Sequence, residues 1–215
     1  KYQEAITYFN KALKINPNGT VYFNIGNVYR FKGQLKKALN FYSKTIECEP
    51  HHAEGHNNEG STLLDLGQTK EAIKSFKRAI QINPNNIDCY NNLGMAFSIL
   101  RKYTEAVSAH ELAIGLNPNC VKTLKKLGYA LERAKNLPQA INNFRKAAQF
   151  SPEDTEAEIK FRYLKDKVCD WSNSDELVSS ISKFGIGEDI VEPFFMYSME
   201  DHPERQLIRA SKYVL

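Results

Sequence analysis

Three asparagines recur at a fixed interval in this chain: Asn24, Asn58 and Asn92 each lie 34 residues from the next. Asparagine is a poor residue for helix interiors, so its recurrence needs a reason other than helix propensity. A primary amide has one acceptor oxygen and two N–H donors, and it can therefore bond both the C=O and the N–H of a peptide backbone. The column predicts binding of extended peptides without regard to their side chains, and the alternative is a solvated polar face.

The asparagines lie within a repeat of the same 34-residue length. Glycines and alanines recur at that interval: Gly26, Gly60, Gly94 and Gly128, then Ala38, Ala72, Ala106 and Ala140. Prolines follow in step: Pro17, Pro50, Pro84, Pro118 and Pro152. Small residues allow two helices to pack at the close end of the usual ~8 to 10 Å separation, and proline ends the second helix because it lacks an N–H. Each repeat is predicted to form two helices of about 14 residues.

An aromatic residue or His follows four residues after each alanine, at Tyr42, Phe76, His110 and Phe144. At these glycine, alanine, ring and proline positions the pattern resembles the tetratricopeptide repeat (TPR). The resemblance covers residues 1–152, as half a repeat plus four whole repeats. It implies an all-α fold, a TPR superhelix or alpha-alpha solenoid, with a concave groove lined by the first helix of each repeat. Residues 153–168 are predicted to form a capping helix with Ser151 as its N-cap. Residues 169–215 are expected to be a junction and the start of a further domain.

The helical period indicates which side chains face the groove. With the glycine as position 8, the groove positions are expected to be 2, 5, 6, 9, 12 and 13. The predicted peptide-binding residues are Asn24, Asn27, Asn57, Asn58, Asn91, Asn92, Lys122, Lys125, Lys126 and Tyr129. The three lysines, with Arg133, predict a preference for acidic or phosphorylated segments. A solvated basic surface is the alternative for that patch.

A histidine cluster is a candidate metal site, because His51, His52 and His56 are close together in sequence. The first two follow Pro50 in a turn and His56 is at a packing position, so no metal ligand is assigned. His56 and Glu59, three residues apart on one helix, are predicted to form an internal polar pair instead. No nucleophile motif or pair of catalytic carboxylates is present in the sequence, so no catalytic residue is assigned either.

Composition and charge give no reason to expect nucleic-acid or membrane partners. The net charge is only +4, and no nucleic-acid motif accompanies it, so nucleic-acid binding is not expected. No apolar run of 18 residues or more occurs, so no membrane association is expected. The four cysteines fit neither a zinc site nor a disulfide framework, which favours a reducing, cytoplasmic setting. The sequence neither predicts nor excludes a homodimer formed through the convex face.

The sequence after the repeats resembles a more specific family than the repeats alone do. "VCDWSNSDELVSSI" and "EPFFMYSMEDHPERQLIRASKY" resemble the junction between repeats and catalytic region in the O-linked N-acetylglucosamine transferase family, in its bacterial and plant-like branch. That family has a Cys-Asp-Trp motif after the last repeat, an asparagine ladder in the repeats, and then the Rossmann-like lobes of a GT-B glycosyltransferase. The resemblance implies a substrate-recruiting arm of a nucleotide-sugar-dependent protein O-glycosyltransferase, with UDP-N-acetylglucosamine (UDP-GlcNAc) or GDP-fucose as donor.

Two departures limit what this resemblance implies. Phe194 and Phe195 follow Pro193 where the animal enzymes have histidines, so no catalytic residue carries over. The sequence ends at Leu215 before any donor-binding lobe, so these residues alone are expected to be inactive and to hold no cofactor.

The alternative function is a non-enzymatic TPR scaffold or adaptor that mediates protein–protein interactions. Chaperone-tail adaptors of the TPR class grip a peptide's terminal carboxylate with basic residues. Here Phe23, Asp88 and Asn92 occupy the positions of those cations, which disfavours that grip.

Overall fold

The computed structural model describes residues 2–168, which form helices without any strand in that range. The helices are α1 Tyr2–Ile15, α2 Gly19–Phe31, α3 Leu35–Cys48, α4 Ala53–Asp65, α5 Thr69–Ile82, α6 Ile87–Ile99, α7 Tyr103–Leu116, α8 Val121–Arg133, α9 Leu137–Phe150 and α10 Thr155–Lys167. The expected junction and further domain, with the Cys-Asp-Trp motif, lie outside the described residues. No helix from α1 to α10 combines the length and apolar character needed to cross a bilayer.

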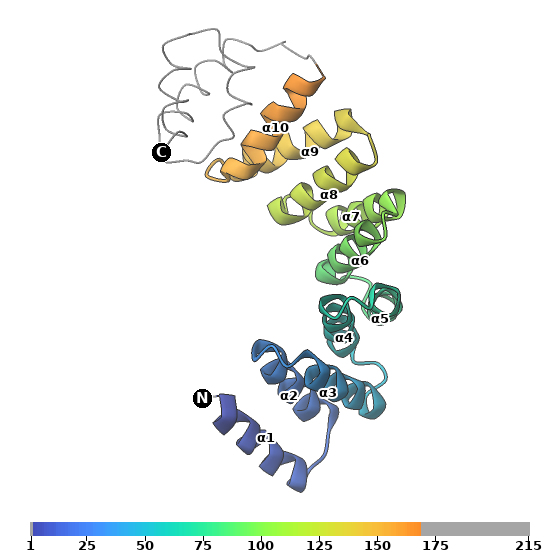
Figure 1. Cartoon of the computed structure of the whole chain (residues 1–215), viewed down its shortest axis with the longest axis vertical. Coiled ribbons are helices and arrows are strands. Elements are labelled where there is room, and N and C mark those ends of the chain that lie inside the picture. The colour runs from blue at the N-terminus through green and yellow to red at the C-terminus, as the bar shows by residue number, and fades with distance from the viewer. Residues whose placement is uncertain (1, 169–215) are drawn as a thin grey trace.

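The helices form a curved solenoid (Figure 1). Four antiparallel pairs, α2–α3, α4–α5, α6–α7 and α8–α9, are the four repeats, preceded by α1 as half a repeat and followed by α10. Figure 1 shows α4, α6 and α8 on the inner side of the arc and α5 and α7 on the outer side. The predicted all-α TPR superhelix is confirmed.

A ring from the second helix of each repeat packs on the glycine of the first. A Cβ added at each glycine would lie within 2.6 to 2.7 Å of a ring atom, for the pairs Gly26 with Tyr42, Gly60 with Phe76, Gly94 with His110, and Gly128 with Phe144. Real Cβ atoms do not approach that closely, so the glycines are required by the rings rather than by the backbone conformation. The four ring side chains are buried in consequence.

The turn between the two helices of each repeat contains a left-handed residue at position 15. Gly33 and Gly67 adopt it with φ of 70° and 77°, as glycine does readily. Arg101 and Lys135 adopt it with φ of 58° and 63°, at a cost of roughly 1 kcal/mol each because their Cβ atoms crowd the backbone. The third and fourth repeats thus place a cation where the first two have glycine.

The capping helix begins later than predicted. Asp154, not Ser151, is the N-cap of α10, and its carboxylate accepts a hydrogen bond from the Ala157 N–H at 3.2 Å. Ser151 instead ends α9, and its C=O accepts from the Asp154 N–H at 2.9 Å to close a turn. The prediction that Ser151 caps this helix is wrong, because that turn separates it from the first helical residue.

The predicted pair of His56 and Glu59 is also wrong. The His56 ring contacts the Pro50 carbonyl oxygen through Nε2 at 3.1 Å. Glu59 accepts hydrogen bonds from Ser75 Oγ at 2.8 Å and from Ser43 Oγ at 3.4 Å, so it bonds the two neighbouring outer helices instead. The nearby His52 is the N-cap of α4, where its Nδ1 accepts from the Gly55 N–H. Within residues 2–168 no group of three metal-ligating side chains is found.

Candidate peptide-binding face

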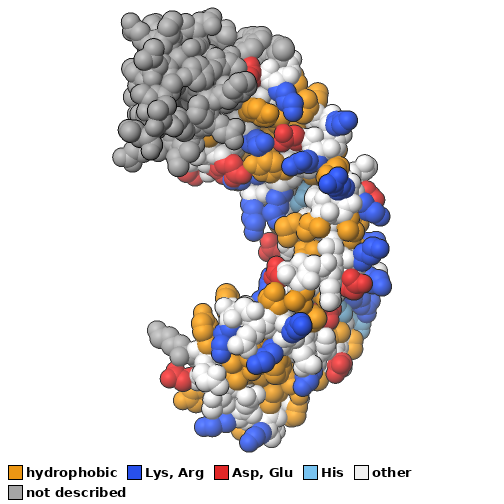
Figure 2. All heavy atoms as spheres, in the orientation of Figure 1, with side chains coloured by type: hydrophobic (Ala, Val, Ile, Leu, Met, Phe, Trp, Pro, Cys, Tyr) orange, Lys and Arg blue, Asp and Glu red, His pale blue; other side chains and the backbone are white. Residues whose placement is uncertain are grey.

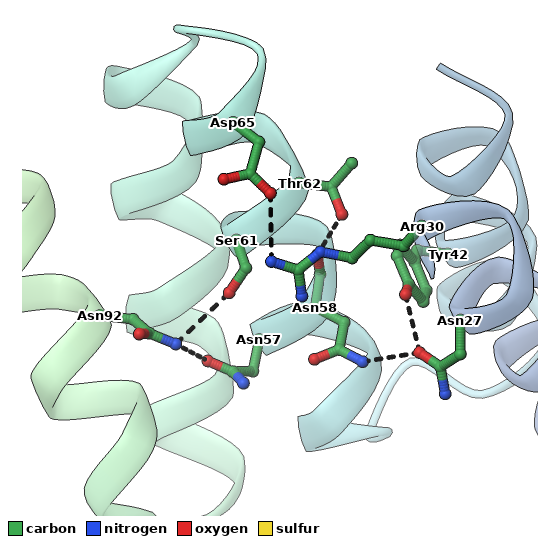
Figure 3. Close-up of polar contacts among 9 residues, drawn as sticks. All are labelled: Asn27, Arg30, Tyr42, Asn57, Asn58, Ser61, Thr62, Asp65 and Asn92. Atoms are coloured by element: carbon green, nitrogen blue, oxygen red, sulfur yellow. Dashed lines mark hydrogen bonds and ion pairs between the residues drawn. The ribbon is translucent and has the colours of Figure 1, made fainter. Parts of the chain in front are cut away.

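The inner helices bring asparagines of successive repeats into contact (Figure 3). Asn58 Nδ2 on α4 donates to Asn27 Oδ1 on α2 at 2.9 Å, and the Tyr42 hydroxyl donates to the same oxygen at 2.7 Å. Burial raises the pKa of Tyr42 to about 12, so its hydroxyl stays a donor at neutral pH. Asn27 is thereby held with its oxygen toward the protein.

A second contact joins the next two repeats. Asn92 Nδ2 on α6 donates to Asn57 Oδ1 at 3.0 Å and to Ser61 Oγ at 3.3 Å, both on α4 (Figure 3). Each amide in these contacts uses one end for the protein. The interrepeat hydrogen bonds therefore fix the orientation of the asparagines as well as linking the repeats.

The other end of each amide has no hydrogen-bond partner within the described residues. Asn27 and Asn57 retain an Nδ2 donor, while Asn58 and Asn92 retain an Oδ1 acceptor. Asn24, half-buried at the equivalent position of the first repeat, makes no side-chain hydrogen bond in the described part of the chain. The inner face thus presents both donors and acceptors, which is what the backbone of an extended peptide would need.

Asn91 does not belong to this face. It is only 2% exposed, and its Nδ2 donates to Thr123 Oγ1 at 2.8 Å. Its Oδ1 is 3.1 Å from His110 Nδ1, so the His110 ring donates from that nitrogen. The prediction that Asn91 lines the groove is wrong, because its amide is buried and bonds His110 of its own repeat and Thr123 of the next.

Position 5 of every repeat shows the same behaviour. Its residue contacts the next first helix or the capping helix, or the N-cap of that helix, in the pairs Phe23 with His52, Asn57 with Asn92, Asn91 with Thr123, and Lys125 with Asp154. Position 5 therefore always contacts the next helix along the inner side, and its side chain reaches the groove only where that contact leaves it half-buried, as at Asn57.

Lys125 is the last of these contacts, and its charge is neutralised. Its Nζ lies 2.6 Å from Asp154 Oδ2 and 2.6 Å from Glu156 Oε2, both at the start of α10. The Tyr129 hydroxyl donates to the other Glu156 oxygen at 2.6 Å. Hydrogen bonds from Lys125 and Tyr129 hold the pKa of Glu156 below its usual value. Lys125 thus joins the cap to the repeats and is not a free cation of the groove.

Two recesses open between first helices. The amide niche, of about 550 Å³, lies between α2 and α4 and is lined by Asn27, Arg30, Phe31, Leu35, Asn58 and Asp65. The cationic niche, of about 500 Å³, lies between α6 and α8, and its lining includes Met95, Ile99, Arg101, Lys126, Tyr129 and Arg133. Positions 9 and 13 of one repeat, with positions 6 and 13 of the next, line both niches.

The two niches differ in charge. In the amide niche Arg30 pairs with Asp65 at 3.2 Å, so its two charges cancel. The cationic niche has three cations and no acid in its lining, and Figure 2 shows Lys and Arg side chains gathered on the inner side beside α8. Burial, with repulsion from Lys122, lowers the pKa of Lys126, while Asp88 opposes that shift.

Sequence reasoning placed Lys126 and Tyr129 at this niche but missed Met95, Ile99 and Arg101. Met95 and Ile99 are at groove positions 9 and 13, so the helical period does indicate that they face the groove. They were not predicted because only polar and charged residues were assigned to peptide binding. Arg101 lies in the turn after α6, where no helical period applies.

Family models built from known proteins match the repeats of this chain. Models of the tetratricopeptide repeat match residues 1–18, 19–52, 41–74, 60–98 and 87–120. The chain carries TPR repeats. No curated protein matches it.

Solved TPR structures share the fold. MamA is 24% identical over 72% of this TPR chain and 91% of its own, with a TM-score of 0.66. YrrB, described as a TPR protein with an unusual peptide-binding site, is 20% identical over 95% of this chain and 97% of its own, with a TM-score of 0.67. A thermophilic TPR protein of Thermus thermophilus is 19% identical over 76% and 90%, with a TM-score of 0.61. Similarity at this level establishes the architecture alone.

Proposed function

We propose that this TPR chain binds extended polypeptides along its inner face, as a protein-interaction scaffold. The observation that carries the proposal is the orientation of the asparagines: hydrogen bonds between repeats hold one end of each amide and leave the other end free. The description of YrrB as a TPR protein with a peptide-binding site supports the same class of ligand.

The spacing of the repeats suits a peptide backbone. If equivalent helices lie about 10 Å apart and an extended chain advances about 3.3 Å per residue, one asparagine would meet about every third peptide residue. Each hydrogen bond contributes about 0.5 to 1.5 kcal/mol net. Binding through a few such contacts is weak and tolerant of sequence, as a scaffold for many partners requires.

The test is the affinity of an uncharged extended peptide, measured by calorimetry on the whole chain. Asn58→Ala and Asn92→Ala should each weaken binding by about fivefold, the equivalent of roughly 1 kcal/mol. Asn40→Ala is the matched control, because Asn40 is exposed on the outer helix α3. Unchanged affinity in both groove variants would remove the amide mechanism.

A narrower role is supported by the resemblance of residues 168–215. In this role the superhelix recruits polypeptides for a nucleotide-sugar-dependent protein O-glycosyltransferase that resembles O-linked N-acetylglucosamine transferase and uses UDP-GlcNAc or GDP-fucose. The residues that support it are the Cys-Asp-Trp motif at 169–171 and the stretch after Pro193. The test is the gene sequence beyond the Leu215 codon, where two Rossmann-type lobes are expected. If other sequence follows there, the scaffold role stands and the glycosyltransferase role is refuted.

A further inference from the structure

The cationic niche has an apolar surface large enough for one side chain. Met95 and Ile99, four residues apart on α6, are 42% and 55% exposed although both are large and apolar. Tyr129 forms a wall that is fixed twice, by its hydroxyl on Glu156 and by its edge-to-face contact with Phe144 at 5.0 Å. A fixed aromatic beside exposed aliphatic side chains favours an inserted apolar group.

The charged residues that line that surface are all cations. Arg101, Lys126 and Arg133 line it, and within residues 2–168 none of them has an ion pair. Three other cations of the inner face are paired: Arg30 with Asp65, Lys125 with Asp154, and Lys160 with Glu132. Lys122, predicted to line the groove, is exposed and has no ion pair within residues 2–168, and it lies outside the lining of the niche. Lys126 is half-buried, so its charge has lost water, and the influence of Asp88 does not amount to an ion pair. A carboxylate of a ligand would supply that pair.

His110 completes the wall without adding charge. Burial, with the charge of Lys126, lowers the pKa of His110 to about 4, so its ring is neutral at physiological pH. The attraction for acids at pH 7 therefore comes from the arginines and the lysine alone.

We propose that the cationic niche is a specificity site, which binds a large apolar side chain flanked by carboxylates within an extended peptide. The inference rests on the proposed peptide-binding function and names the segment that it selects. An acidic segment with one aromatic residue would place the ring between Ile99 and Tyr129, and its neighbouring carboxylates beside Lys126 and Arg133. The amide niche would bind the adjoining backbone without selecting a sequence.

Synthetic peptides with both ends blocked test the proposal by calorimetry. The first has Asp-Glu-Phe-Glu-Asp at its centre, the second replaces the acids with their amides, and the third replaces Phe with Ala. The whole chain should bind the first about tenfold more tightly than either of the others. Equal affinity for the first two peptides would overturn the acidic preference, and equal affinity for the first and third would overturn the apolar site.

Variants of the niche provide the second test. The double variant Lys126→Glu, Arg133→Glu should lose the preference for the acidic peptide and gain one for Lys-Arg-Phe-Arg-Lys, a reversal that misfolding cannot produce. Ile99→Ser should reduce the difference between the Phe and Ala peptides. Lys146→Glu, on the exposed side of α9, is the matched charge control and should change nothing. A double variant that still prefers the acidic peptide would refute the assignment.

The two proposals fail in different ways. If all the peptides bind alike and Asn58→Ala weakens each of them, the scaffold function stands and the specificity site is refuted. If none of the peptides binds the whole chain, both proposals are refuted.

Discussion

The amide niche and the cationic niche occupy the same positions of the repeat and differ in almost every side chain. Position 6 has Asn58 in one and Lys126 in the other, and position 13 of the same helices has Asp65 and Arg133. The backbone beneath them is alike, because each repeat is built from the same glycine and ring contact. One repeat architecture therefore provides a neutral site and a charged site on a single face.

The difference between the niches also shows that helix packing and ligand binding depend on different positions of the repeat. Positions 8 and 24, the glycine and the ring, hold the two helices of a repeat together, and position 5 connects one repeat to the next. Positions 6, 9 and 13 differ between the two niches, although some of their side chains also bond a neighbouring repeat. Substitutions there should change what binds, and substitutions at the packing positions should change stability.

The largest expected effect concerns the ring that backs each niche. At the amide niche the ring is Tyr42, whose pKa is raised by burial to about 12, and at the cationic niche it is His110, whose pKa is lowered to about 4. Between pH 6.5 and 4 the unfolded state binds a proton at His110 that the folded state does not. Stability is therefore complete above the unfolded pKa of about 6.5 and falls by about 3 kcal/mol as the pH drops toward about 4.

Denaturant unfolding of the wild type and of His110→Phe across that range measures the effect. Phenylalanine occupies this position in two other repeats, at Phe76 and Phe144, and the difference between the two proteins removes the contribution of the carboxylates. His110→Phe should lose the corresponding part of the pH dependence. Parallel curves for the two proteins would show that His110 is not the titrating group.

The packing beneath the two niches should respond alike. Gly26→Ala and Gly94→Ala each place a Cβ within 2.7 Å of a ring, so each should destabilise by about 1 to 3 kcal/mol in denaturant unfolding. Gly115→Ala is the control, because nothing lies within 4 Å of its added Cβ and the helix gains up to about 1 kcal/mol. A stable Gly94→Ala beside an unstable Gly26→Ala would mean that the two niches differ in packing too.

A smaller change should make the amide niche resemble its counterpart. Asp65→Asn removes the partner of Arg30, and because both side chains are partly exposed the cost in stability should stay below about 1 kcal/mol. The released arginine should raise the affinity for the acidic peptide about twofold, measured by calorimetry. Glu105→Gln breaks a comparable exposed pair on α7 and should leave the affinity unchanged. No gain with Asp65→Asn would indicate that net charge does not separate the niches.

The smallest effect is expected at Lys125. Its charge is already satisfied by Asp154 and Glu156, so Lys125→Gln should change the affinity for the acidic peptide by less than about twofold. Lys126→Gln, at the adjacent residue, should weaken the same binding about fivefold by calorimetry. A larger loss of affinity with Lys125→Gln than with Lys126→Gln would show that Lys125 belongs to the binding site.

The fold was predictable from spacing, because the glycine, ring, alanine and proline positions each have a packing or backbone reason to recur. The candidate site was predictable only in part. Helical periodicity placed Asn58 and Lys126 on the inner face, but it also placed Asn91 and Lys125 there. Periodicity describes one helix, whereas the side chains at position 5 are engaged by the next repeat through Thr123 and by the N-cap of the capping helix, Asp154.

The charge of the cationic niche could not be derived from sequence for the same reason. Lys125 and Lys126 are adjacent and chemically identical, and only the position of α10 shows that the first is paired and the second is not. The later start of that helix, at Thr155, is what allows Asp154 to cap it and to meet Lys125 at the same time.

The central claim is that one extended peptide lies along the inner face and contacts both niches. The niches are two repeats apart, roughly 20 Å at about 10 Å per repeat, which an extended chain covers in about six residues. The direct measurement is a titration of the ¹⁵N-labelled chain with an extended peptide that carries the acidic aromatic segment at one end. The account predicts shifts of the side-chain amides of Asn27 and Asn57 and of the backbone of α6 and α8, while the backbone of α5, which lines neither niche, stays unchanged. Shifts confined to α5 would contradict it.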